Sequence, residues 1–63
     1  MAHIKCRYYQ DYGEYGQCEY HEFEKTVRYY ELDGYDNLNL KNKFISGDDI
    51  VYLEIDGRVI KDE

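Results

Sequence analysis

The chain lacks proline and tryptophan, and its 63 residues include one serine, two cysteines and two histidines. Because Ser46 is the sole serine, a Ser-His-Asp triad has little support. The sequence contains neither a GxxxxGK[ST] loop nor a GxGxxG turn, so no phosphate-cradling loop of a nucleotide-binding enzyme is indicated. No apolar run approaches the roughly 20 residues that cross a bilayer, and the first residues lack the apolar core of a signal peptide. These absences predict a non-enzymatic protein of the cytosol.

Aliphatic side chains are also scarce. There are twelve: Ile4, Val27, Leu32, Leu38, Leu40, Ile45, Ile50, Val51, Leu53, Ile55, Val59 and Ile60. Nine tyrosines and two phenylalanines must therefore complete the core of a single domain covering residues 1–63. Chains of about this length bury only about 60% of the surface that the unfolded form exposes. A metal, a disulfide or a second copy in a homodimer could supply the missing stability.

The net charge of −6 comes from fourteen carboxylates against eight Lys and Arg side chains. This excess argues against direct nucleic-acid binding, which needs clustered cations, and against docking on anionic lipid. The natural complement is a protein with a basic surface, and the alternative is that the charge serves only solubility.

Short β-favouring runs separated by turn residues predict a mainly β fold, a small antiparallel sheet of four to five short strands. Residues 50–55 and 58–61 form a hairpin around Asp56-Gly57, which would place Leu53 opposite Ile60. Residues 40–45 are expected to form one further strand. Residues 19–32 fit either a strand or a single helix, and the helix would make the fold α+β.

The N-terminal third holds every cysteine and histidine, in the spacing H-x-x-C and then C-x-x-H. A hairpin turning near Tyr12 would place Cys6 opposite Cys18 and His3 opposite His21. Residues three apart on a strand point to opposite faces, so a single site requires each two-residue spacer to curl into a tight turn, as in a zinc knuckle.

Three interpretations of these four side chains stay open. They could be the ligands of a structural zinc, whose closed tetrahedral shell would leave no position for a reacting water. The thiols could be reduced and packed as small apolar groups, with both histidines at the surface. The cysteines could also form a cross-strand disulfide, which a cytosolic location disfavours.

Carboxylates and tyrosines surround the predicted knuckle and would form an acidic, aromatic rim suited to a basic protein groove. The candidate partner-binding residues are Asp11, Tyr12, Glu14, Tyr15, Glu19, Tyr20, Glu22 and Glu24.

With His3, Cys6, Cys18 and His21 beside this acidic, tyrosine-rich surface, the chain resembles the anti-CRISPR proteins of phages and mobile elements, some of which are metalloproteins that inhibit Cas9. The resemblance implies stoichiometric inhibition of a CRISPR nuclease in the host cytosol. Two alternatives from other classes are a zinc-knuckle module that binds nucleic acid directly and a redox-responsive dithiol protein that uses Cys6 and Cys18.

Overall fold

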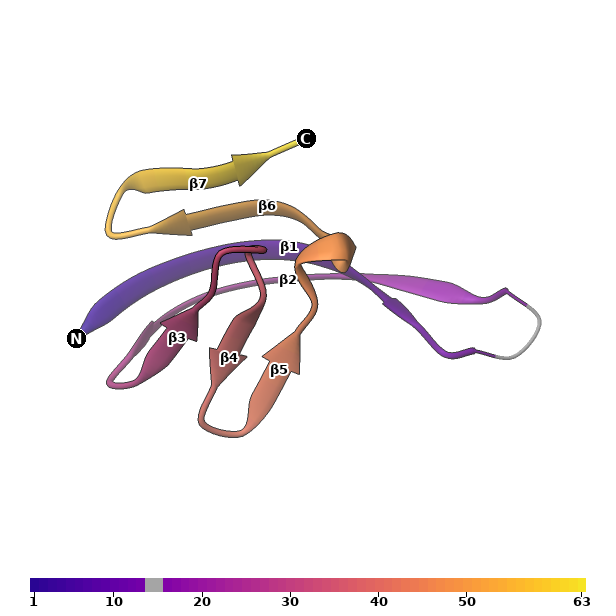
Figure 1. Ribbon diagram of the computed structural model, residues 1–63, viewed down its shortest axis with the longest axis horizontal. Coiled ribbons are helices and arrows are strands. Elements are labelled where there is room, and N and C mark those ends of the chain that lie inside the picture. The colour runs from indigo at the N-terminus through magenta and orange to yellow at the C-terminus, as the bar shows by residue number, and fades with distance from the viewer. Residues whose placement is uncertain (14–15) are drawn as a thin grey trace.

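The chain folds into antiparallel β-structure in the computed structural model, which describes residues 1–13 and 16–63 (Figure 1). The strands are β1 (Ala2–Asp11), β2 (Cys18–Val27), β3 (Tyr30–Leu32), β4 (Leu38–Leu40), β5 (Lys43–Ile45), β6 (Ile50–Ile55) and β7 (Arg58–Asp62), with a 3₁₀ turn, η1 (Gly47–Asp49), before β6. The prediction of a mainly β fold is confirmed. The helical alternative for residues 19–32 is wrong, because β2 and β3 occupy that segment.

The strands form two sheets rather than one. The large sheet has the order β2-β1-β6-β7 and the small sheet has the order β3-β4-β5. The small sheet lies against one face of the large sheet, with its short strands running across the long ones (Figure 1). The face of the large sheet that meets the small sheet is called the inner face below, and the opposite face is called the outer face.

The core lies between the two sheets and follows from the two-residue period of a strand. Its ten buried side chains are Ala2, Ile4, Cys6, Tyr8, Leu38, Leu40, Ile45, Ile50, Leu53 and Ile55. In β1 the buried residues alternate with exposed or half-buried ones as far as Tyr8. The last residues of β1 are exposed, and that end of the β1–β2 hairpin projects beyond β6, β7 and the small sheet (Figure 1).

Two local predictions in the C-terminal half need correction. Residues 40–45 are not one strand, because Lys41 and Asn42 form a turn that joins β4 to β5. The hairpin around Asp56-Gly57 is confirmed, and both turn residues have positive φ angles of 52° and 81°. Leu53 faces Lys61 rather than Ile60, because a register irregularity follows Leu53, although Ile60 still packs against the core.

One polar network connects the β3–β4 loop to η1. The carboxylate of Asp33 accepts hydrogen bonds from the backbone N–H of Tyr35 (2.8 Å) and of Asn37 (3.1 Å), and from the Asn37 side-chain amide (2.9 Å). These bonds, chiefly that from the Asn37 side chain, lower the pKa of Asp33. The Asn37 Oδ1 atom in turn accepts a hydrogen bond from the buried N–H of Gly47 (2.7 Å). The loop is thereby fixed directly against the Gly47 backbone.

Candidate functional site

The register of the β1–β2 hairpin differs from the one predicted. Cys6 lies opposite Phe23 and Cys18 lies opposite Asp11, a shift of five residues from the expected pairing of Cys6 with Cys18. An odd shift turns every side chain of β2 to the other face of the sheet. The observed register places Phe23 and Val27 on the inner face, where both pack against the core, so the hydrophobic pattern of β2 selects it.

The structure separates the four predicted metal ligands. His3 lies on the outer face, where its ring nitrogens contact Thr26 Oγ1 (3.2 Å) and Glu24 Oε2 (2.5 Å). Cys6 is in the core, Cys18 is exposed near the hairpin turn, and His21 stacks on the Tyr8 ring with 5.3 Å between centroids.

His3 and Cys18 lie near opposite ends of the hairpin, eight residues apart along β1. At about 3.3 Å per residue, roughly 26 Å of strand separates them, whereas zinc ligands lie within about 2.3 Å of the metal. Within residues 1–13 and 16–63, no group of three or more His, Cys, Asp or Glu side chains is arranged to hold a metal ion. This hairpin therefore does not form the predicted four-ligand site, and zinc binding itself stays a prediction.

Both cysteines are free thiols and are too far apart to be bridged in this fold. Cys18 lies five residues along β2 from Phe23, the partner of Cys6, which corresponds to roughly 17 Å. Disulfides require Cα atoms within about 7 Å of each other. A redox switch that joins the two thiols would therefore need the hairpin to rearrange.

The two thiols should differ strongly in reactivity. Burial raises the pKa of Cys6 from 9.0 to about 11, with Lys43 opposing the effect, whereas Cys18 is exposed. At pH 8 we expect a maleimide to modify Cys18 at least about a hundredfold faster than Cys6, because the thiolate is the reacting form. Peptide mapping after timed labelling measures this ratio, and Cys18→Ser isolates the slow thiol. Equal rates in the folded protein would contradict the placement of Cys6.

The raised pKa of Cys6 in the folded state makes folding stability depend on alkaline pH. The folded state favours the neutral Cys6 thiol, so this contribution is complete below pH 9 and is lost as pH rises toward about 11. We expect the free energy of unfolding to fall by up to about 2.5 kcal/mol over this range. Urea titrations at pH 8, 9.5 and 11 measure the loss, and Cys6→Ala should have a flatter profile.

The candidate partner-binding residues divide between two faces of the hairpin. Tyr20, Glu22 and Glu24 alternate on the outer face of β2 and are all exposed. Asp11 follows on the same face, whereas Tyr12 and Glu19 share the opposite one, where loss of solvent and the neighbouring Glu19 raise the pKa of Tyr12. Two members of the predicted set, Glu14 and Tyr15, lie outside the described residues.

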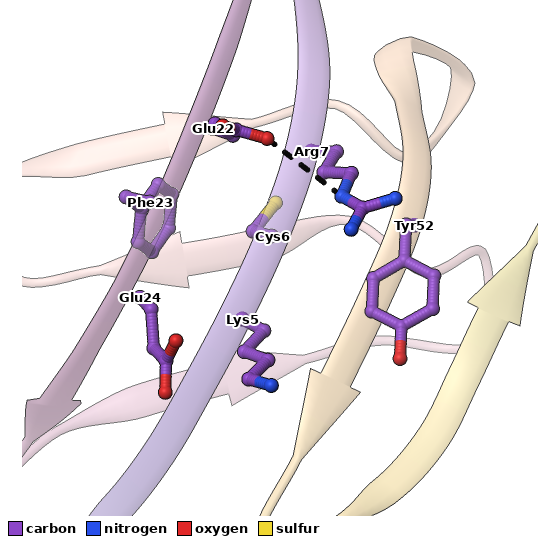
Figure 2. A pocket seen from close by; sticks show the side chains of 7 residues that line it. All are labelled: Lys5, Cys6, Arg7, Glu22, Phe23, Glu24 and Tyr52. Carbon is purple, nitrogen blue, oxygen red and sulfur yellow. Dashed lines mark ion pairs between the residues drawn. The ribbon is translucent and has the colours of Figure 1, made fainter.

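The outer face beside these glutamates is a mixed-charge surface with a shallow, open depression (Figure 2). Its lining residues are Lys5, Cys6, Arg7, Glu22, Phe23, Glu24 and Tyr52. Arg7 lies between Glu22 and the Tyr52 ring (Figure 2). Its Nε atom is 3.8 Å from the Glu22 carboxylate, and its Cζ atom is 5.1 Å from the centroid of the Tyr52 ring. A hydrogen bond to His3 lowers the pKa of Glu24, and Lys5 adds to the effect. Such cross-strand pairs stabilise a solvated sheet face.

The cysteine of this depression is not activated as a nucleophile. Its one cysteine, Cys6, has its side chain buried in the core, and burial raises the pKa of that thiol to about 11, which leaves it protonated at neutral pH. Among the described lining residues, no histidine stands beside that thiol as a general base.

The free edge of β2 is the feature that the sequence did not reveal. The order of the large sheet places β2 at its edge, with β1 as its one neighbour in the described part of the chain. The Tyr12 N–H donates to the Gln17 carbonyl (3.1 Å), so the backbone groups of these two residues point toward each other across the hairpin. In the regular ladder that follows, the odd-numbered residues of β2 bond to β1 in the same way.

The even-numbered residues of β2 consequently point their backbone N–H and C=O groups away from the sheet. They are Cys18, Tyr20, Glu22, Glu24 and Thr26. This row of backbone groups, with the side chains of the same residues beside it, is called the β2 edge below. The β2 edge could be identified only from the hairpin register, because a shift by one residue would exchange the residues whose backbone groups point toward β1 with those whose groups point away.

Comparison with known proteins supplies no further information on this edge: no family model, no curated protein and no solved structure matches the chain. Among the described residues, no helix is long and apolar enough to cross a membrane.

Proposed function

We propose that the chain is a non-enzymatic binding protein whose β2 edge accepts an extended, basic segment of a partner protein as an additional strand. The observation that supports this is the row of outward backbone groups on five alternate residues of a ten-residue strand. An edge of this kind is a ready template for another strand, and strand addition is a recurring mode of peptide recognition. Backbone hydrogen bonds would supply affinity, and the flanking side chains would supply selectivity.

The side chains at the β2 edge indicate a basic partner. Glu22 and Glu24 lie on the outer face of β2 and Glu19 lies on its inner face, all exposed. A partner strand with Lys or Arg at alternate positions would place opposite charges across from the two outer-face glutamates, each pair adding roughly 0.2–1 kcal/mol. Tyr20, with 46% of its surface exposed, offers an aromatic anchor on the same face.

A second copy of the chain fits this edge less well. When β2 pairs antiparallel with β2 of a second copy, each residue with outward backbone groups must face another such residue. Two registers meet this condition and pair nearly the whole of β2. One register places Glu22 opposite Glu22, and the other places Glu22 opposite Glu24 twice. Like charges directly opposite each other destabilise a strand pair, as edge charges do in proteins that avoid self-association.

The class of partner follows from this charge. Proteins that handle nucleic acids carry basic surfaces, and a CRISPR nuclease such as Cas9, the partner implied by the anti-CRISPR resemblance, belongs to that class. The carboxylates that favour a basic protein segment disfavour direct contact between the β2 edge and a phosphate backbone. The proposal does not require zinc.

Amide hydrogen exchange tests the proposal at the level of single residues. In the free protein we expect the Phe23 and Lys25 amides to exchange slowly and the Glu22 and Glu24 amides to exchange quickly. A nine-residue peptide that alternates lysine with valine serves as the probe. On binding, Glu22 and Glu24 should become protected, and protection confined to other strands would exclude strand addition at β2.

Proline variants separate edge pairing from simple charge attraction. Proline is tolerated at a sheet edge where its missing N–H would face solvent. Glu22→Pro should therefore stay folded and lose peptide binding, whereas Val59→Pro on the opposite edge strand, β7, should keep it. The Glu22→Gln/Glu24→Gln pair should weaken binding about tenfold without affecting the backbone. Unchanged binding by a folded Glu22→Pro variant would overturn the proposal.

A further inference from the structure

Half of the cations of this acidic chain line one groove. Its lining residues are Lys25, Val27, Arg28, Tyr29, Leu40, Lys41, Asn42 and Lys43. Four of the eight Lys and Arg side chains are in this set, and no Asp or Glu lines the groove. The remainder of the sequence then has fourteen carboxylates against four cations. A cationic groove on a protein of net charge −6 is a marked local reversal of charge.

The groove forms where the small sheet meets the end of β2. Lys25 and the half-buried Val27 lie on the inner face of β2, and Arg28 and Tyr29 continue the chain toward β3. On the other side, the turn at Lys41 and Asn42 joins β4 to β5. The groove is therefore built from segments that the fold holds in place, although they are far apart in the sequence.

No ion pair between a groove cation and a carboxylate is found among the described residues. The ion pairs found in the described part of the chain involve His3, Arg7, His21 and Lys61, none of which lines the groove. Lys25 lies over the Phe23 ring (5.1 Å).

Lys43 lies over the Tyr8 ring (4.9 Å) and donates a hydrogen bond to the Tyr8 hydroxyl. These aromatic contacts position the two ammonium groups without cancelling their charge. An anion that enters the groove would therefore gain from several cations at once.

From this arrangement we infer that the groove binds a compact anion carrying two or more phosphate groups. Its volume of about 290 Å³ is close to the lower end of the range for small-molecule sites, about 300 Å³. Arg28 can hold phosphate oxygens in a bidentate manner, and Lys25 and Lys41 can act as point charges. The Asn42 side-chain amide adds a neutral hydrogen-bond donor at the turn.

Two sources of this chemistry are an inorganic polyphosphate and a nucleotide. Tyr29, which is 47% exposed, lies beside the cations and offers a ring on which a base could stack. A hydrogen bond to Glu31, which does not itself line the groove, raises the pKa of the Tyr29 hydroxyl. Stacking would make a nucleoside triphosphate bind more tightly than triphosphate alone.

The test is a titration with inorganic triphosphate, followed by amide chemical shifts of the full chain. We expect shifts that saturate, weaken with added salt and fall within residues 25–29 and 40–43. Lys41→Gln and Arg28→Gln should each weaken binding about tenfold, the loss of roughly one charge-assisted hydrogen bond. Lys5→Gln removes a cation from the outer face and should leave the affinity unchanged.

Asn42→Asp supplies a second variant that keeps every cation and adds a negative charge at the turn, so it too should weaken binding. The inference is overturned if millimolar triphosphate produces no saturating shift, if the shifts center on Lys5 and Arg7, or if Lys5→Gln weakens binding as much as Lys41→Gln. ATP distinguishes the source: tighter binding with Tyr29 ring shifts indicates a nucleotide, and equal binding indicates the phosphate chain alone. Neither result depends on the β2 edge, because Glu22→Pro should leave triphosphate binding intact.

Discussion

Replacement of Gly47 by alanine should remove a large share of the stability of the folded chain. A Cβ atom at this position would lie 2.2 Å from the Tyr35 carbonyl oxygen, and 2.9 Å and 3.0 Å from the carbonyl carbon and oxygen of Asp36. These are backbone atoms of a loop that Asn37 ties to the Gly47 N–H, so the loop cannot withdraw without breaking that hydrogen bond. We expect a loss on the order of 3 kcal/mol or more. A chain of this length has a total stability of roughly 3–9 kcal/mol.

Gly34→Ala is the matched control for this prediction. Gly34 lies in the same loop, and a Cβ atom there would have no neighbour within 4 Å. Its φ is not positive, so alanine should change the free energy of unfolding by less than about 0.5 kcal/mol. Urea unfolding followed by circular dichroism compares the two variants. A Gly47→Ala variant as stable as Gly34→Ala would show that the β3–β4 loop is not packed against η1 as described.

The second large effect is expected for Leu53→Ala. Leu53 is fully buried (0% exposed) on β6 beside Cys6 of β1, in the core between the two sheets. Truncation of a buried leucine costs roughly 2–5 kcal/mol, because transfer energy is lost and a cavity remains. The chain has few aliphatic residues with which to fill that space, so the upper half of this range is expected.

The urea midpoint of Leu53→Ala, with the slope of the transition, measures the cost. Val59→Ala removes apolar atoms from a residue on β7 that is 52% exposed, and it should change stability by less than about 0.5 kcal/mol. Similar losses in the two variants would mean that the inner face is not the core of the molecule. A changed slope would instead point to an altered unfolded state.

Local signals in the sequence predicted the fold class correctly. Asp56-Gly57 marks a hairpin because both positions need positive φ, and the run of residues 50–55 has the composition of a buried strand. The turn at Lys41 and Asn42 contains neither glycine nor proline, and its one local signal, the turn-favouring Asn42, was overlooked. The division into two sheets could not be found from local signals, because it depends on which strands pair with one another.

The hairpin register could not be found from the spacing of cysteine and histidine. The symmetry of H-x-x-C and C-x-x-H suggested one alignment, whereas the burial of Phe23 and Val27 selects another. Residues three apart on a strand point to opposite faces, which argued against a single metal site. The regular pairing of β1 with β2 follows this rule. Glu22 and Glu24 were identified from charge alone, but their outward backbone groups depend on that register. The cationic groove was not foreseen, because Lys25 and Lys41 meet only through the packing of the small sheet.

The position of β1 affects how the chain acquires its structure as it is synthesised. β1 is made first, yet it lies in the middle of the large sheet, between β2 and β6. Its hairpin with β2 can form early, but a two-stranded hairpin is marginal in water, and β6 begins only at Ile50. The edge of β1 that pairs with β6 therefore stays unpaired until Ile50 and the residues that follow it have been made. A nascent chain that stalls before Ile50 exposes the unpaired backbone groups of this edge, and would be a substrate for chaperones and proteases in the cell.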